Sequence, residues 1–164
     1  MSDFFTKTDL SRKDAESIIS ETLNNCDDGE LYLENSKSES IVLDDDKIKS
    51  SSYSSDLGYG LRAVTGEVVA YSHSNEISKK SLKQSASNLS STLKSQKGIY
   101  NHEIPQTNEK FYKDVNPIEE KSLQSKLDLL KEVNNYTRAK GGIVQQVTAS
   151  FAGEHKSIEI IRSG

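Results

Sequence analysis

Before Pro117, two stretches of the chain carry apolar residues at the spacing of an amphipathic helix. The stripe of the first stretch comprises Ala15, Ile18, Ile19, Thr22, Leu23 and Cys26. Ser11 precedes this stripe as an N-cap residue, and Asp14 stands three positions later, as in a capping box. The stripe of the second stretch comprises Leu82, Ala86, Leu89 and Leu93. We therefore predict helices that begin after Ser11 and after Ser78 and turn one apolar side toward a core.

Residues 30–73 alternate between apolar and polar types, which is the pattern of half-buried strands. The acidic triplet at 44–46 predicts a turn within this region. The serine-rich segment 47–55 alternates only weakly and predicts an exposed or edge strand. The apolar runs at 58–64 and 67–71 lie on either side of Thr65-Gly66 and predict a β-hairpin.

A third helical stripe begins after Pro117 and comprises Leu123, Leu127, Leu130 and Val133. A β-like run at 144–151 follows, and Gly153-Glu154 predicts a turn into a returning strand at 157–161. This order of elements predicts an α+β fold in which helices cover a mostly antiparallel β-sheet, a two-layer α/β sandwich.

The same pattern predicts how the chain is organised into domains. Residues 1–98 form the α+β core, and residues 99–116 form a connecting segment. Residues 117–164 add a helix and a β-hairpin that complete or extend the same domain.

The composition excludes several functional classes. The chain is 33% hydrophobic and has no Trp, so its core must be lean. Its 25 acidic and 21 basic residues are interspersed, which argues against a nucleic-acid-binding surface. No stretch approaches the ~20 apolar residues that span a bilayer, and the first ten residues have no apolar signal core. We expect a cytoplasmic protein that binds neither nucleic acid nor membranes, and the single Cys26 agrees with this.

No catalytic or metal-binding motif is recognisable in the chain. His102-Glu103 begins like a helical zinc motif, but Gln106 and Thr107 stand where a second histidine would be needed. His73 and His155 are isolated in the sequence. The triplet at 44–46 lacks the alternating ligands and distal glutamate of a calcium loop.

The glycine-rich segment around Arg62 does not have the composition of a phosphate-binding loop. Gly58 and Gly60 are followed by neither a third glycine nor a Lys-Ser/Thr pair, so they favour a bent strand or a closely packed backbone. Arg62 lies in the same strand and is either a paired structural cation or a contact to a peptide or partner protein.

Several strings resemble the TldD/PmbA family of bacterial metalloproteases. They are residues 29–36, 39–44, 55–67, 112–117, 125–130 and 144–151. The segment 55–67 is the most telling, because Gly58, Gly60 and Arg62 reproduce the family pattern of a strand with G-x-G-x-R before a glycine turn. The later strings are similar to TldD rather than to its paralogue TldE, also called PmbA.

The resemblance implies a zinc metallopeptidase, formerly called a modulator of DNA gyrase. In this family a TldD-like subunit pairs with a TldE/PmbA-like subunit and cleaves unfolded or extended peptides inside a chamber. Zinc would be held by an H-E-x-x-x-H helix and a later cysteine, with the glutamate as general base.

That zinc motif does not occur in this sequence. We therefore expect an N-terminal region, truncated before the metalloprotease domain, with no catalytic residue, no metal ligand and no activity alone. Gly58, Gly60 and Arg62 are the candidate contacts to substrate or partner. The alternative is a non-catalytic binding or assembly module, of the gyrase-modulator type, that pairs with a TldE/PmbA-like subunit or with itself.

Overall fold

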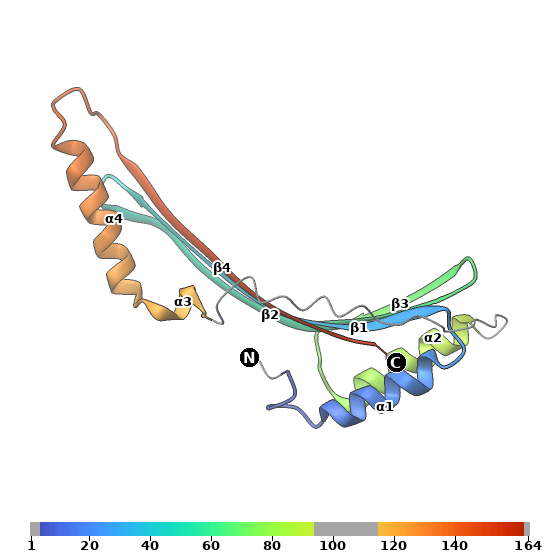
Figure 1. Ribbon diagram of the computed structural model, residues 1–164. Helices are drawn as coiled ribbons and strands as arrows, with labels where there is room; N and C mark the ends of the chain where they lie inside the picture. The colour runs from blue at the N-terminus through green and yellow to red at the C-terminus, as the bar shows by residue number, and fades with distance from the viewer. Residues whose placement is uncertain (1–3, 94–114, 163–164) are drawn as a thin grey trace. The chain divides into compact units, whose positions relative to one another are not determined.

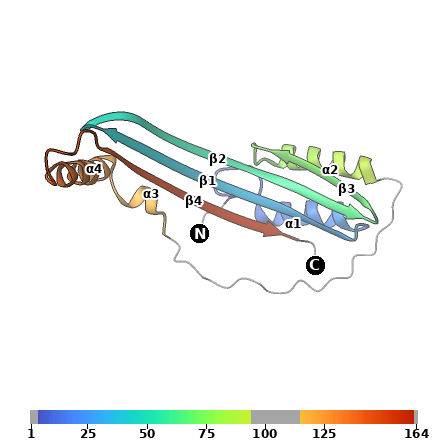
Figure 2. The same cartoon turned by 90° about the horizontal axis from the view of Figure 1, so that it is seen from above.

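The computed structural model describes residues 4–93 and 115–162 (Figure 1). The elements are α1 (Arg12–Leu23), β1 (Asp28–Asp44), β2 (Lys47–Thr65), β3 (Val68–Ser74), α2 (Lys79–Leu93), α3 (Pro117–Glu120), α4 (Leu123–Arg138) and β4 (Thr148–Ile161). The strands form one antiparallel sheet in the order β3-β2-β1-β4, as Figure 2 shows from above. Helices pack on this sheet, so the predicted α+β sandwich is confirmed.

The chain divides into two compact units. The first unit consists of Met1–Asn35, Asp56–Tyr112 and Ser157–Gly164, and the second consists of Ser36–Ser55 and Lys113–Lys156. Strands β1, β2 and β4 each contribute residues to both units. Within the described ranges, no helix is long and apolar enough to cross a membrane.

The core of the first unit lies between its part of the sheet and the helices α1 and α2. Its fully buried side chains include Ile19, Leu23, Leu31, Leu33, Leu61, Leu82 and Leu89. The predicted helix starts are confirmed, because Ser11 Oγ accepts the Asp14 N–H and Ser78 Oγ accepts the Ser81 N–H, both at 3.1 Å. Cys26 lies beyond the end of α1 and is buried in this core, where it packs as a small apolar residue.

The second unit has a smaller core between α4 and its part of the sheet. Its buried apolar residues are Ile41, Leu43, Leu130 and Ala149, with Leu127 and Phe151 partly buried beside them. The predicted apolar stripe of α4 is partly wrong, since Leu123 and Val133 are exposed while Lys126 and Asn134 are buried. Compared with the predicted stripe, α4 turns Lys126 and Asn134 toward the core in place of Leu123 and Val133.

Two tight turns connect the first three strands. Asp45 and Asp46 have φ angles of 46° and 63°, so the β1–β2 turn has the positive φ at both central residues that defines type I′. The second hairpin is confirmed, but its loop is Gly66-Glu67 rather than Thr65-Gly66. Gly66 has a φ of 59°, which fits glycine at the first central position of a type II′ turn.

The strands are longer and fewer than the sequence pattern predicts. β2 runs without a break from Lys47 to Thr65, through the segments 47–55 and 58–64 that the sequence presents separately. The register pairs β3 with Tyr59–Thr65, so the exposed segment 47–55 lies outside the β2–β3 pairing and is an edge, as predicted. The predicted hairpin at 144–161 is wrong, because β4 is one strand that passes straight through Gly153 and Glu154.

Candidate functional site

Gly58, Gly60 and Arg62 lie on β2 in the first unit and point to the same side of the sheet. Between them stand Tyr59 and Leu61, which are buried in the core beneath α1 and α2. Side chains alternate between the two faces of a strand, so the three predicted residues share the face that is turned away from these helices. We call this surface of the first unit the open face.

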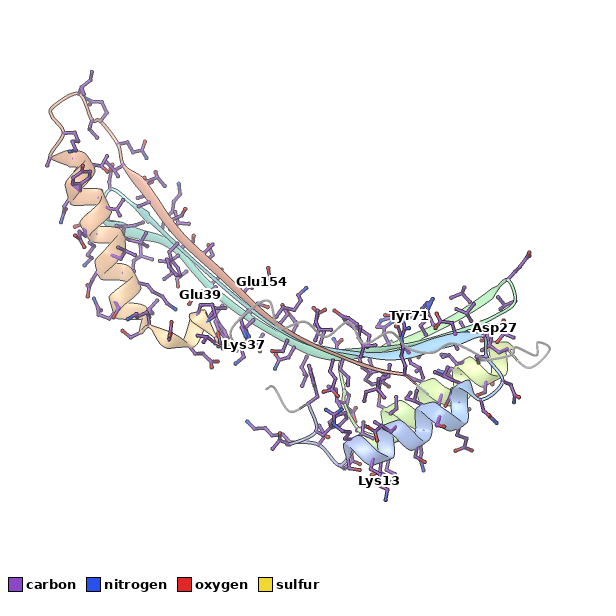
Figure 3. The ribbon with its side chains drawn as sticks, in the orientation of Figure 1. Lys13, Asp27, Lys37, Glu39, Tyr71 and Glu154 are labelled. Atoms are coloured by element: carbon purple, nitrogen blue, oxygen red, sulfur yellow. The ribbon has the colours of Figure 1, made fainter. Side chains whose placement is uncertain are left out.

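Strand β3 adds Val69, Tyr71 and His73 to the open face. Arg62 is paired across the strands with Tyr71, and Gly60 with His73. Val69 and Tyr71 are 60% and 64% exposed, and Figure 3 shows Tyr71 on the side of the sheet away from α1 and α2. The Tyr71 and His73 rings are stacked with centroids 5.9 Å apart. The open face therefore carries an exposed aromatic pair beside the predicted residues.

At both glycines of β2, neighbouring atoms occupy the space that a side chain would need. A Cβ atom on Gly60 would lie 2.6 Å from the Tyr71 hydroxyl oxygen, so the tyrosine ring occupies the space above this glycine. A Cβ atom on Gly58 would lie 2.8 Å from the main-chain oxygen of Ser74. Both positions therefore show the close packing that the sequence indicated.

Arg62 is a paired cation. Its Nη1 and Nη2 atoms donate to Asp28 Oδ2 at 2.9 and 3.1 Å. Arg162 directly follows β4 and donates through Nε and Nη2 to Glu30 Oε2 of β1 at 3.2 and 2.8 Å. Both pairs are partly exposed, so each adds little to stability and serves mainly to fix the side chains in place.

Tyr32 and Glu34 are neighbours along β1. The Tyr32 hydroxyl donates to Glu34 Oε2. This hydrogen bond to a carboxylate, followed by burial and the negative charge of Glu34, raises the pKa of Tyr32 to about 12. Tyr32 therefore stays protonated at neutral pH and cannot act there as a general base.

The histidines and the cysteine do not come together. His73 belongs to the first unit and His155 to the second, Cys26 is buried in a core, and His102 lies outside the described residues. Across residues 4–93 and 115–162, no group of three or more His, Cys, Asp or Glu side chains could hold a metal ion. The described residues therefore do not fit the zinc that the family resemblance implies.

The acidic triplet at 44–46 forms the β1–β2 turn and holds it in place. Asp44 accepts hydrogen bonds from Gln146 and Thr148 at 2.8 and 2.9 Å, and these bonds hold the pKa of Asp44 below its usual value. Asp45 is paired with Arg138 and also accepts the Val147 N–H. These contacts bind the turn to the segment before β4, as the turn interpretation requires.

A buried ion pair in the second unit was not predicted. Lys126 Nζ donates to Glu39 Oε1 at 2.5 Å and to the Ile118 carbonyl at 2.6 Å, with the two ionic side chains 4% and 11% exposed. The Phe151 ring lies 5.6 Å from the ammonium group. The only trace of this ion pair in the sequence is a lysine beside the apolar stripe of a helix. An ordinary exposed lysine gives the same pattern.

An open apolar groove of about 410 Å³ lies in the second unit between α4 and the start of β4. Its lining includes Leu129, Val133, Val147, Ala149 and Phe151, and none of its lining residues is charged. The groove therefore offers apolar contact but no group for acid–base chemistry.

Comparison with known proteins gives the family. Residues 29–92 match the family described as PmbA/TldA metallopeptidase domain 1. The metalloprotease TldD homolog of Buchnera aphidicola (subspecies Acyrthosiphon pisum) is 35% identical over 133 residues, which cover 80% of this chain and 28% of that protein. The homolog of Haemophilus influenzae is 31% identical over 143 residues, which cover 84% and 29%. The chain thus spans less than a third of the length of these two relatives.

Solved structures share the fold. A candidate modulator of DNA gyrase from Bacteroides thetaiotaomicron has a TM-score of 0.59 at 19% identity, over 90% of this chain and 38% of that chain. TldE from Thermococcus kodakarensis has a TM-score of 0.57 at 14% identity, over 90% and 34%. At such identities the likeness concerns the fold alone. The family match and the TldD homologues aligned along most of the sequence show that this chain belongs to the TldD/PmbA metalloprotease family.

Proposed function

We propose that this chain is the substrate-contacting and subunit-contacting region of a TldD-like metalloprotease. The complete protein would pair with a TldE/PmbA-like subunit and hydrolyse unfolded peptides. The observation that carries this proposal is the 35% identity to a metalloprotease TldD homolog along 133 residues. The chain covers 28% of that relative, so peptide hydrolysis is a property proposed for the complete protein.

The part played by this region is binding rather than bond cleavage. A family metal would polarise the scissile carbonyl and activate water, but the described residues offer no ligand set for it. The chain supplies instead a sheet surface on which ion pairs hold Arg62 and Arg162 in place beside exposed apolar side chains. Such a surface fits a binding role for the open face.

The open face has the character of a contact surface. Val69, Tyr71, Ile158 and Ile160 are all more than half exposed and lie on the outer strands of the sheet. Interfaces are enriched in tyrosine and arginine, which give large contact areas and directed hydrogen bonds. We therefore assign Gly58, Gly60 and Arg62 to this surface as candidate contacts to substrate or partner, with the Tyr71 ring seated on Gly60.

Pairing is tested by co-expression with a TldE/PmbA-like protein from the same genome. We expect the two chains to co-purify and to show the mass of a heterodimer by light scattering. Tyr71→Asp combined with Arg62→Glu should weaken the complex if the open face takes part. Lys13→Glu is the matched control. Lys13 is exposed on α1, away from the open face, so this variant should leave the complex intact. A chain that stays monomeric with its partner present contradicts the pairing.

A further inference from the structure

Helix α4 carries a second apolar stripe beside the row of residues that enters the core. The residues that α4 buries recur at every fourth position and are Lys126, Leu130 and Asn134. The second row lies next to them at i, i+4 and i+7 and comprises Leu129, Val133 and Tyr136. These three side chains are 49%, 44% and 66% exposed. We call this row the outer stripe, and an apolar row exposed in this way is typical of a helix that packs against a second helix.

The outer stripe forms one wall of the apolar groove in the second unit. Leu129 and Val133 line the groove from the side of α4, and Phe151 lines it from the side of β4. Ile143 lies in the loop between these two elements and is 89% exposed. The groove and the loop beside it thus present apolar surface that a partner could remove from water, which is the main favourable contribution to association.

Opposite charges accompany the outer stripe. Glu132 is exposed and precedes Tyr136 by one helical turn. Lys140 is exposed just beyond the end of α4, and its Nζ atom lies 3.9 Å from the centroid of the Tyr136 ring. The carboxylate of Glu132 therefore stands on the N-terminal side of Tyr136, and the ammonium group of Lys140 lies over the ring itself.

This order of charges distinguishes two ways of pairing α4 with α4 of a second copy. Parallel helices in register would place Glu132 beside Glu132 and Lys140 beside Lys140, and like charges across an interface are unfavourable. Antiparallel helices with a two-fold axis between Val133 and Tyr136 would place each Val133 against Tyr136 of the other copy. The Lys140 ammonium group, held over Tyr136, would then lie beside Glu132 of the other copy. Charge complementarity therefore selects the antiparallel arrangement.

We propose that two copies of this chain associate through an antiparallel pair of α4 helices, whose outer stripes pack on each other. The loop that follows α4 in one copy lies beside the first half of α4 in the other, so each Ile143 covers the groove of the opposite copy. The contact is isologous, since the same surface serves both copies. It uses residues of the second unit and none of the open face, so it is separate from the pairing proposed above.

Sedimentation equilibrium of the full chain over a range of concentrations tests this proposal. We expect a monomer–dimer equilibrium with a Kd of roughly 1–100 µM, since few side chains of each copy take part. Leu129→Gln and Tyr136→Gln keep a good helix former in α4, and each should raise the Kd at least about tenfold. Circular dichroism verifies that each variant is folded. A chain that stays monomeric at every concentration overturns the proposal.

Charge reversal tests the antiparallel arrangement. Glu132→Lys places two cations at each ionic contact and Lys140→Glu places two anions there, so either variant alone should dimerise at least about tenfold more weakly. An equal mixture of the two variants restores opposite charges at both contacts, and we expect it to form a heterodimer about as tight as the unchanged dimer. No pairing in the mixture overturns the proposal, as does a dimer that neither reversal weakens.

Two controls separate this contact from other association. Lys131 is exposed on the opposite side of α4, so Lys131→Glu should change the Kd by less than about threefold at moderate salt. A dimer that persists unchanged in Leu129→Gln and Tyr136→Gln is formed by another surface and overturns the proposal. Because the chain is measured alone, failure here is distinguishable from failure of the co-purification that tests the proposed function.

Discussion

The phenol ring of Tyr71 covers the backbone of Gly60, although the residue directly opposite Gly60 is His73. The ring therefore reaches diagonally across the two strands. An aromatic ring over a glycine supplies packing that the glycine itself lacks. This contact joins a sequence-predicted residue to an aromatic side chain that was not predicted.

The two β2 glycines should respond differently to alanine. Gly60→Ala would push aside the exposed tip of Tyr71, which can swing away, so we expect a loss of stability below about 1 kcal/mol. Gly58→Ala would meet the fixed main-chain oxygen of Ser74 and should cost about 1–3 kcal/mol. Urea denaturation measures both values. Equal free energies of unfolding for the Gly58→Ala and Gly60→Ala variants would contradict the close contact at Gly58.

The buried Lys126–Glu39 pair should be costly to break from one side. Lys126→Met leaves the Glu39 carboxylate buried without its cation, and we expect a loss of about 3–5 kcal/mol in the free energy of unfolding. Combining it with Glu39→Leu should recover most of that loss, since no uncompensated charge remains. As a control, Lys37→Met breaks the more exposed pair with Glu119 and should cost far less than Lys126→Met.

Asp44 should contribute to the acid sensitivity of the fold. Hydrogen bonds from Gln146 and Thr148, with help from Lys49, lower its pKa in the folded state below the ordinary 3.8. Its contribution is therefore fully present above the unfolded pKa and is lost as the pH falls through the lower folded pKa. Asp44→Asn should flatten the pH dependence of stability below about pH 4, the unfolded value. Asp46→Asn, in the same turn, is the control, and an equal effect in both variants would contradict the assignment.

Tyr32 should titrate late and should couple stability to alkaline pH. Its pKa is raised to about 12, so the folded state holds this proton more tightly than the unfolded chain does. The corresponding stability is fully present below the ordinary value of 10.0 and is lost as the pH rises through the folded pKa. Phenolate absorbance of the protein minus that of Tyr32→Phe isolates this group. Glu34→Gln should bring the pKa back toward 10.0, and no change would refute the role of Glu34.

Much of the fold was predictable because helical spacing is specific. The stripes that contain Ile19 and Leu82 have no competing interpretation, and Ser11 and Ser78 cap their helices as expected. Gly153 misled the prediction, since glycine is typical of turns. In β4 it lies inside the strand, and a Cβ atom there would come no closer than 3.6 Å to its neighbours, so its position requires no turn.

The candidate site was predictable only in part. A period of two placed Gly58, Gly60 and Arg62 on one face, but their partners depend on the hairpin register. Moving the loop from Thr65-Gly66 to Gly66-Glu67 changes every cross-strand partner by two residues, so Tyr71 could not be matched with Arg62 from the sequence. The burial of Lys126 was hidden for another reason, since its partner Glu39 is 87 residues away in the chain.

Each unit is assembled from segments that are distant in the sequence, three in one case and two in the other. No single cut of the gene can therefore release either unit whole. Ending the chain at Tyr112, for instance, would remove Ile161 from one core and Leu130 from the other. Duplication, fusion or exchange between genes must accordingly carry the entire region as one inherited block.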